Sequence, residues 1–574
     1  MNYKTPLGFR DILPEEARAR ELATRLVQDL FASYEYEPIE TPTLENQELM
    51  RTAGYRSSSP FKFFDAQGNL LIMRPDVTMQ VARMCGSRLG DTQHTLRFRY
   101  TQRVFRESDD VITSDPREMT QMGVECIGAD GVDADAEVIS LFIQALRILG
   151  VEHFTLSVAC VGVLNALLAC CEASDEWKAS LLKAFHASNF VELDELCEAY
   201  AESLSPVRAI PALARIRGGI EAIDQARKLL EPYGIKLDDL DALQRTIQLL
   251  IDEGFERYVR VDFSVMSSFD YYTGMVFEAY APGVGSPLGS GGRYDHMLSV
   301  FGPDRPAAGF AFFLEQAMYA AEQEAQASDF DRPLRIAVPK GSLNPDSIEA
   351  LAAAGLDVSR LDSPGRLLVI SNPGVEYIIV RPSDAPVFVT LGAADCGICG
   401  KDSLLEAQSD CVELVDLGFG ACRFIVAEPA QSSHNVEQRI QKRGYLRVAT
   451  KYPHITQWFY DRCGQQVEIV QLHGNIELAP LTGLAERIVD ITATGTTLKE
   501  NNLVVVDEVL SSTARFIANP CAFRTNSAIR SLALKLKAHA QTMNYEPIAG
   551  ASQSVPRKNT QFGEQIQDKL QDQS

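Results

Sequence analysis

The sequence predicts two halves of different architecture, an α+β unit followed by a largely parallel α/β unit. In the first half, strand-like segments surround a mostly helical stretch that runs from about 134 to 260. The predicted strand segments there are a hairpin at 61–73 and strands at 97–105, 123–128, 155–158, 261–266 and 274–280. After a polar, small-residue-rich segment at 322–333, short apolar strands alternate with helical stretches. That alternation is typical of a parallel sheet.

Composition limits the possible partners. The chain has 574 residues, which suggests about three to five domains. It carries 54 Lys and Arg against 77 Asp and Glu, a net charge of −23, so we expect neither a nucleic-acid nor a membrane partner. It has no apolar run long enough to span a bilayer and begins without a signal-peptide pattern. Its 12 Cys form no disulfide framework, so we expect a cytoplasmic protein with reduced thiols.

Two segments of the first half predict helices. Pro14 is suited to the first position of a helix, and an apolar stripe at helical spacing follows it. The stripe consists of Leu22, Leu26, Val27, Leu30 and Phe31. A second apolar helix is expected from about Phe310, after a glycine-rich segment at 283–295.

The second half contains a C-x-x-C pair, Cys396 and Cys399, inside an apolar run. A single pair without His partners is weak evidence for zinc, so we favour a buried strand and keep a redox or metal role as the alternative. The predicted strands of this half are 334–338, 377–380, 396–399, 424–426, 446–449, 467–472, 488–492 and 503–506. The expected domains are 1–325, a linker at 326–333, a second unit at 334–544, and a disordered polar tail at 545–574.

A Thr-rich turn follows one of these strands. Asp490 lies in the strand at 488–492, and Thr494, Gly495, Thr496 and Thr497 come directly after it, ahead of an expected short helix. Consecutive N–H groups at a helix N-terminus and Thr hydroxyls bind phosphate well, and glycine permits close approach. The alternative is a simple helix cap.

The second half resembles the short form of ATP phosphoribosyltransferase, the first enzyme of histidine biosynthesis. The resemblance covers about 334–519 and depends on the motifs 335–341, 393–402, 416–423, 447–453, 474–485 and 488–498. It implies a two-lobed fold like that of periplasmic binding proteins, in which one lobe would comprise 334–417 plus 506–544 and the other 418–505. It also implies that N1 of the adenine of ATP attacks C1 of 5-phosphoribosyl 1-diphosphate, releasing diphosphate.

The resemblance implies a set of site residues. Asp490, Lys340 and Arg381 would be catalytic. Substrate-binding residues would be Thr494, Gly495, Thr496, Thr497, Arg366, Asp402, Arg423, Lys451 and Glu477. Mg²⁺ is expected with the diphosphate, without protein side chains as metal ligands. Ser342 stands where the family usually has Arg, so one substrate-facing cation is missing or replaced.

The first half resembles the catalytic core of histidyl-tRNA synthetase. Its motifs lie at 8–14, 74–78, 97–107, 121–125, 270–278, 291–295 and 309–311. The resemblance covers about 5–320 and implies a class II synthetase fold, an antiparallel sheet flanked by helices.

Two interpretations of this half compete, an active synthetase and the synthetase-like regulatory subunit of ATP phosphoribosyltransferase. Ser267 replaces the catalytic Arg of the synthetase, and Gln316 stands where its ATP-binding Arg would be. No anticodon-binding domain separates the two halves. We therefore favour the regulatory subunit. A bifunctional protein that still charges tRNA remains the alternative, and a pure binding protein with an inert phosphate loop is a third possibility.

The resemblance implies a retained histidine pocket. Its residues would be Asp76, Thr78, Arg106, Gln121, Glu125, Tyr271 and Tyr272. Glu125 and Tyr272 would read the imidazole ring, which offers donors and acceptors to such groups. The alternative is a satisfied core network. We therefore expect a fusion in which histidine inhibits a transferase that uses ATP and 5-phosphoribosyl 1-diphosphate, assembled as a homo-oligomer.

Overall fold

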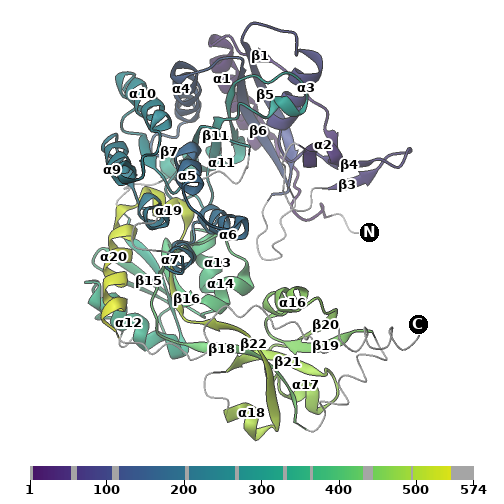
Figure 1. The fold of residues 1–574 in the computed structure, drawn as a ribbon, viewed down its shortest axis with the longest axis vertical. Helices are drawn as coiled ribbons and strands as arrows, with labels where there is room; N and C mark the ends of the chain where they lie inside the picture. Colours follow the sequence, from purple (N-terminus) through teal and green to yellow (C-terminus); the bar gives the residue numbers. More distant parts are fainter. Residues whose placement is uncertain are drawn as a thin grey trace.

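The structure is a computed structural model of the 574-residue chain. It describes residues 4–52, 61–106, 116–200, 206–265, 271–326, 332–361, 366–430, 444–492 and 496–543. Three sheets lie one above another in Figure 1, with the largest at the top and the smallest of the three at the bottom.

The first half is built on a nine-stranded sheet. All pairings are antiparallel except β1 with β5 and β7 with β9. The strands in spatial order are β1 (Glu37–Pro38), β5 (Leu96–Phe105), β6 (Glu118–Ile127), β12 (Ala307–Phe313), β11 (Gly289–Arg293), β10 (Met275–Tyr280), β7 (Thr155–Cys160), β9 (Val259–Asp262) and β8 (Arg217–Gly218). This mostly antiparallel sheet confirms the α+β prediction.

Helices cover this sheet and extend from its β7–β9 side. They are α1 (Pro14–Ser33), α3 (Thr78–Arg88), α4 (Val132–Ile148), α5 (Val161–Ala169), α6 (Asp175–His186), α7 (Phe190–Glu198), α8 (Ala209–Leu213), α9 (Glu221–Leu230), α10 (Asp238–Asp252) and α11 (Leu314–Gln326). Pro14 is the first residue of α1, as predicted. Val27 and Phe31 of the predicted stripe are fully buried, whereas Leu22 is 50% exposed, so the buried face of α1 is narrower than the sequence suggests.

A small sheet beside this unit contains the predicted hairpin. Strand β4 (Leu70–Met73) pairs antiparallel with both β3 (Lys62–Phe64) and β2 (Leu44–Asn46), and α2 (Gln47–Thr52) follows β2.

The predicted start of the helix, near Phe310, is wrong. Residues 307–313 form β12 in the middle of the nine-stranded sheet, and the helix α11 begins at Leu314. Because β12 is a central strand, both of its faces are covered and its apolar residues run without alternation. Such a run cannot be distinguished from a buried helix by periodicity.

The second half contains a six-stranded and a five-stranded sheet. The first has the order β14 (Val369–Asn372), β15 (Val375–Val380), β13 (Leu334–Pro339), β16 (Cys396–Gly400), β23 (Ala514–Ala518), β17 (Val412–Asp416). The second has the order β20 (Val467–Gln471), β19 (Leu446–Thr450), β21 (Arg487–Thr492), β18 (Cys422–Pro429), β22 (Leu503–Ser512). Each predicted strand of this half overlaps one of these strands. Both sheets are mixed and not largely parallel as predicted, because each combines parallel with antiparallel pairs.

Each of the two sheets defines a lobe. Lobe 1 carries the six-stranded sheet with α12 (Asn344–Ala353), α13 (Ala385–Thr390), α14 (Lys401–Ala407), α19 (Pro520–Thr525) and α20 (Ser527–Thr542). Lobe 2 carries the five-stranded sheet with α16 (Pro453–Arg462), α17 (Leu478–Leu481) and α18 (Thr496–Glu500). The boundary expected at 505/506 falls inside β22, which pairs with β18 of lobe 2 as far as Ser512. The tail expected at 545–574 lies outside the described residues.

The C-x-x-C pair lies in the core of lobe 1. Cys396 and Cys399 are both on β16, a fully buried strand, and both are free thiols. Burial raises the pKa of each thiol well above its usual value, which makes them poor nucleophiles. The buried-strand prediction is therefore confirmed.

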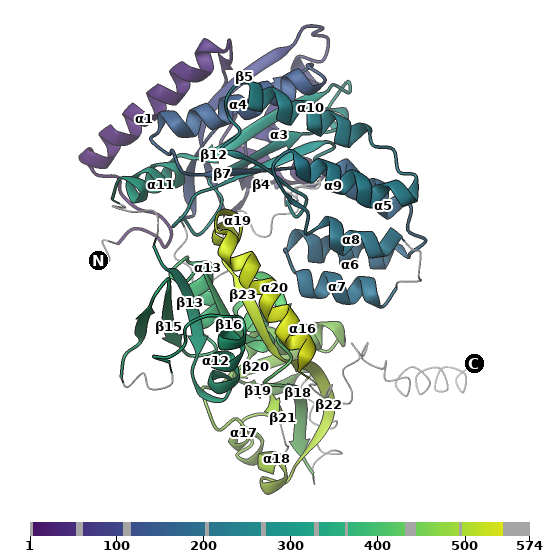
Figure 2. The ribbon, with the colours of Figure 1, turned by 90° about the vertical axis from the view of Figure 1, so that its left-hand side faces the viewer.

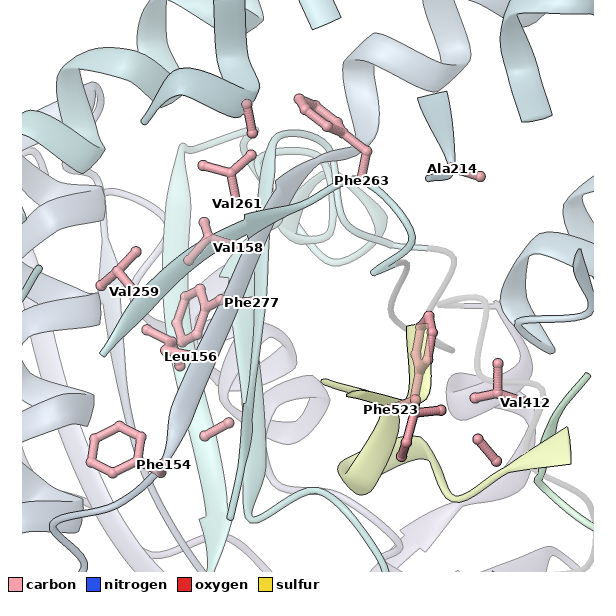
Figure 3. Close-up of a cluster of buried hydrophobic side chains, with 14 of the residues drawn as sticks. Phe154, Leu156, Val158, Ala214, Val259, Val261, Phe263, Phe277, Val412 and Phe523 are labelled. Atoms are coloured by element: carbon pink, nitrogen blue, oxygen red, sulfur yellow. The ribbon is translucent and has the colours of Figure 1, made fainter. Parts of the chain in front are cut away.

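The two halves share a continuous apolar core. Lobe 1 contacts the first half through α19, which lies directly beneath the large sheet in Figure 2. Helix α7 covers β17, the edge strand of the six-stranded sheet, and Asn189 forms a parallel bridge with Glu413 there. Figure 3 shows residues of this core from both halves, with Val158 and Phe277 on the large sheet and Phe523 on α19. Covering β17 removes an unpaired sheet edge from solvent.

Candidate functional site

The predicted histidine-reading residue Glu125 lies at the centre of a buried polar cluster on β6. Its side chain is fully buried. The Tyr100 hydroxyl donates to Glu125 Oε1 at 3.3 Å, and the Tyr294 hydroxyl donates to Oε2. Burial raises the pKa of Glu125 to about 8, while hydrogen bonds from Tyr294 and Thr78 oppose the rise. The carboxyl group is therefore largely neutral at pH 7 and is able to donate as well as accept.

Asp76, Thr78 and Gln121 lie in the same cluster. Gln121 Nε2 donates to Asp76 Oδ2 at 3.1 Å, and Gln121 Oε1 accepts from the Val77 N–H at 3.1 Å. Asp76 and Thr78 both act on Glu125, the first raising and the second lowering its pKa. The structure thus brings together four of the seven predicted residues, all of them buried.

Tyr271 and Tyr272 complete one side of this cluster. Their ring centres are 4.7 Å apart, and Tyr271 meets Tyr294 edge to face at 6.0 Å. Arg106 lies at the end of β5, where its guanidinium stacks over Phe313 at 4.8 Å and Nε donates to the Pro75 carbonyl at 3.4 Å. Ser267 lies outside the described residues. Gln316 donates to Ser286 at 2.9 Å.

Three residues at this cluster were not predicted as members. Tyr100 and Tyr294 hold the two oxygens of Glu125, and Gly309 faces it closely. A Cβ at Gly309 would lie 2.0 Å from Glu125 Oε2 and 2.5 Å from the Val124 carbonyl oxygen. The motifs at 291–295 and 309–311 contain Tyr294 and Gly309, but a motif does not say which of its residues contact Glu125.

In lobe 1, the predicted cations lie where parallel strands end. Lys340 follows β13 and Arg381 follows β15. These strands pair in parallel with Pro339 opposite Val380, and the Lys340 N–H donates to the Val380 carbonyl at 2.8 Å. Both side chains are exposed. They are therefore neighbours at the C-terminal edge of the sheet, the edge where α/β proteins bind ligands.

Asp490 occupies the corresponding edge of lobe 2. It lies on β21, next to β19, and Lys451 directly follows β19. Burial raises the pKa of Asp490 to about 6, the nearby Glu477 adds to the rise, and Lys451 opposes it. The Ile491 N–H donates to Asp490 Oδ1 at 2.8 Å. The structure thus brings Asp490, Lys451 and Glu477 together around a partly buried carboxylate.

Asp402 is held at the start of α14. Its Oδ1 accepts from the Ser512 hydroxyl at 2.8 Å, and its N–H donates to the same hydroxyl at 3.0 Å. Burial raises the pKa of Tyr452, and Asp402 of lobe 1 and Asp490 of lobe 2 both add to the rise. Tyr452 therefore lies within electrostatic range of predicted residues from the two lobes.

The remaining predicted residues are less closely associated. Nη1 of Arg423 on β18 lies 3.6 Å from Oε2 of Glu508 on β22. The side chain of Arg366 is exposed. Thr494 and Gly495 lie outside the described residues. Thr496 and Thr497 open the short helix α18, which confirms the predicted helix after the turn.

The described residues contain neither a ready-made metal site nor a membrane-spanning helix. Within them, no group of three or more His, Cys, Asp or Glu side chains is arranged to hold a metal ion. Among the same residues, no helix combines the length and apolar character that a membrane span requires.

The fold and these clusters define a synthetase-like domain joined to a two-lobed transferase domain. The family model described as histidyl-tRNA synthetase matches residues 8–317, and that described as ATP phosphoribosyltransferase matches residues 381–538. The chain belongs to the histidyl-tRNA synthetase family in its first half and to the ATP phosphoribosyltransferase family in its second half.

Individual relatives divide in the same way. An ATP phosphoribosyltransferase of Rubrobacter xylanophilus is 52% identical over 202 residues, 35% of this chain and 94% of that protein. An ATP phosphoribosyltransferase regulatory subunit of Desulfitobacterium hafniense is 34% identical over 333 residues, 58% of this chain and 85% of that protein. The crystal structure of an ATP phosphoribosyltransferase regulatory subunit/histidyl-tRNA synthetase from Bacillus halodurans matches at 30% identity with a TM-score of 0.52, covering 66% of this chain and 99% of that chain.

Proposed function

We propose that this chain catalyses the first step of histidine biosynthesis and carries its own regulatory domain. The reaction transfers the 5-phosphoribosyl group from 5-phosphoribosyl 1-diphosphate to N1 of the adenine of ATP. The observation that carries the proposal is the partly buried Asp490 beside Lys451 and Glu477, directly ahead of the Thr-rich turn. Family membership of both halves supports it.

The chemistry asks little of a general base. The adenine N1 lone pair forms the new bond to C1, and the C1–O bond breaks with its electron pair leaving on the diphosphate. The proton lost from the product comes from the adenine amino group, which the positive charge on the ring makes acidic. Catalysis therefore depends on positioning and on charge stabilisation. We assign Asp490 to the ribose hydroxyls and to the cationic character of C1 in the transition state.

Cationic side chains would serve the phosphates. Lys340 and Arg381, which lie side by side at the edge of lobe 1, would bind the diphosphate or the ATP phosphates. Lys451, Arg423 and Arg366 are further candidates. The turn at 494–497 would hold the 5-phosphate. Asp402 would orient substrate from the lobe 1 side through its fixed carboxylate.

Magnesium would arrive with the diphosphate. Mg²⁺ is usually held by one or two carboxylates, several waters and substrate phosphates. The sparse donor set around Asp490 and Glu477 fits such a substrate-borne ion better than a dedicated protein cage. When bound, the ion would neutralise charge on the leaving diphosphate.

We further propose that the first half binds histidine and that bound histidine lowers transferase activity. The support is the buried cluster of Asp76, Gln121 and Glu125 with tyrosine hydroxyls, which offers both donors and acceptors to an imidazole and an amino group. Binding at one site then changes affinity at the other by a coupling free energy. The regulatory-subunit relatives are by name parts of an assembly, and we propose a homo-oligomer here.

The test is turnover of ATP and 5-phosphoribosyl 1-diphosphate with Mg²⁺, followed as phosphoribosyl-ATP with and without histidine. We expect turnover that histidine suppresses. Turnover that ignores histidine would reduce the first half to a scaffold, and no turnover would reject the catalytic proposal. Histidine-dependent exchange between ATP and diphosphate would instead support the bifunctional synthetase.

A further inference from the structure

Helix α16 of lobe 2 begins without a cap of its own. Its first residue is Pro453, and the side chain of the N-cap residue Tyr452 accepts no hydrogen bond from the helix. The N–H groups of the second and third helical residues, His454 and Ile455, are the ones that an N-cap side chain ordinarily binds. If they were left unpaired away from water, they would destabilise the helix start.

Glu406 of lobe 1 supplies the missing cap. Its Oε1 accepts from the His454 N–H at 3.2 Å, and its Oε2 accepts from the Ile455 N–H at 3.1 Å. The His454 Nδ1 lies 2.7 Å from the Glu406 carbonyl oxygen. A carboxylate at this position is also favoured by the helix dipole. The Glu406 side chain is only 20% exposed, so water competes weakly for these bonds.

The two helices that Glu406 joins both adjoin the proposed site. Helix α14, which ends just after Glu406, begins with Lys401 and Asp402. Helix α16 directly follows Lys451 and Tyr452. The contact therefore fixes the segment that carries Asp402 relative to the segment that carries Lys451.

The chain itself joins the lobes elsewhere. It passes from lobe 1 to lobe 2 between β17 and β18, and returns between β22 and β23. Two chain segments that cross between the lobes in this way allow the lobes to move about a hinge, unless another contact restrains that motion. The contact between α14 and α16 is such a restraint, visible near the centre of Figure 1 where the two helices lie side by side.

We propose that Glu406 is a positioning residue that latches the two transferase lobes together by capping α16 from the opposite lobe. It touches no reacting atom. Its consequence for turnover rests on the proposed function. The latch sets the position of Asp402 in lobe 1 relative to Asp490 and Lys451 in lobe 2. A shift of about 1 Å in the relative position of these residues can lower the rate on the order of 100-fold.

The experiment compares Glu406→Ala and Glu406→Gln with Glu349→Ala, an exposed glutamate on α12 of the same lobe. Spin labels report the distance between the lobes in the full chain. They are attached to unnatural amino acids that replace Glu468 of lobe 2 and Lys535 of α20 in lobe 1. Glu406→Ala should broaden this distance distribution and shift it to longer distances. It should also lower kcat/KM by about 10- to 100-fold. Glu406→Gln, which keeps one acceptor oxygen, should lie between Glu406→Ala and wild type. Glu349→Ala should match wild type in both measurements.

Several outcomes would overturn the latch. An unchanged distance distribution in Glu406→Ala would reject it, whatever the activity. A changed distribution with activity equal to that of Glu349→Ala would reject the positioning role of Glu406 in turnover. If Glu406→Ala fails to fold, Glu406→Gln takes its place in the same comparison. If the wild-type chain shows no turnover, the distance measurement still decides the latch, and only the proposed function fails.

Discussion

The guanidinium of Arg524, on α19 of the transferase half, lies 4.9 Å from the ring centre of Tyr280 on β10 of the first half. Both side chains are buried, and Arg524 also donates to the Ser188 hydroxyl at 3.3 Å. Arg217 of β8 donates to the carbonyl oxygens of Phe523 and Arg524. The two halves are therefore joined by buried polar contacts as well as by their shared apolar core.

Replacing Arg524 should loosen this junction. Arg524→Leu leaves Glu278 without its nearby buried cation, and removing one member of a buried charged group costs roughly 3–5 kcal/mol. We expect a lower Tm and a loss of histidine inhibition. Lys537→Met is the matched control because it breaks a half-exposed ion pair with Asp194 across the same junction, which should cost about 1 kcal/mol or less. Equal Tm values for the two variants would contradict the prediction.

Glu125→Gln should weaken histidine binding while leaving basal turnover in place. The amide keeps the shape of Glu125 but presents a fixed donor and acceptor to the imidazole, and it avoids the cavity that Glu125→Ala would leave. We expect histidine affinity to fall by about 10-fold or more. Isothermal titration with histidine measures the affinity, and a turnover assay without histidine is the control. Unchanged affinity would remove Glu125 from the proposed site.

Glu125 should also make stability depend on pH. Its pKa is raised to about 8 in the folded state against a usual value of 4.5, so between these values the folded state binds more protons than the unfolded state. Stability should therefore fall as pH rises from about 5 to 8, with a slope that can reach about 1.4 kcal/mol per pH unit from this group. Denaturant unfolding at several pH values measures the slope. Glu125→Gln should flatten it, and an identical slope in that variant would contradict the assignment.

The ionisation of Asp490 should determine how activity falls as the pH is lowered. Its pKa is raised to about 6 by burial, and the ionised form is the one proposed to face the cationic sugar. We expect kcat/KM for 5-phosphoribosyl 1-diphosphate to fall about tenfold per pH unit below 6. Asp490→Asn should lower kcat by about 100- to 1000-fold. Asp461→Asn, at an exposed position on α16 of the same lobe, is the control and should leave both values near wild type.

Gly309→Ala should damage the first half specifically. The new methyl group would lie 2.0 Å from Glu125 Oε2 and 2.5 Å from a backbone oxygen that a central strand cannot move. We expect a loss of about 1–3 kcal/mol in unfolding free energy together with weaker histidine binding. Gly474→Ala, at a position with nothing within 4 Å of the added methyl, should leave Tm almost unchanged. A Gly309→Ala protein as stable as Gly474→Ala would contradict the packing argument.

Periodicity predicted most elements of the fold, but it misplaced the start of the helix after β12 and overstated the buried face of α1. The hairpin at 61–73 and the strands of the second half were found because turn residues bound short apolar runs. The end of strand β12, from Phe310, resembles a helix in sequence because both faces of this central strand are covered. The predicted apolar stripe of α1 includes Leu22 and Leu26, yet these two side chains are 50% and 37% exposed. Spacing alone places residues on one side of a helix but does not say how much of that side is covered.

The sequence by itself determined the two families, the order of the two halves, and the residue types of both clusters, because motifs record chemistry in local strings of residues. Tertiary structure alone decided that Tyr100 and Tyr294 hold Glu125, that Lys340 lies beside Arg381, and that Glu406 caps a helix of the other lobe. These contacts join residues from 25 to 169 positions apart. They arise from strand register and helix packing, which depend on the whole core and leave no local signature in the chain.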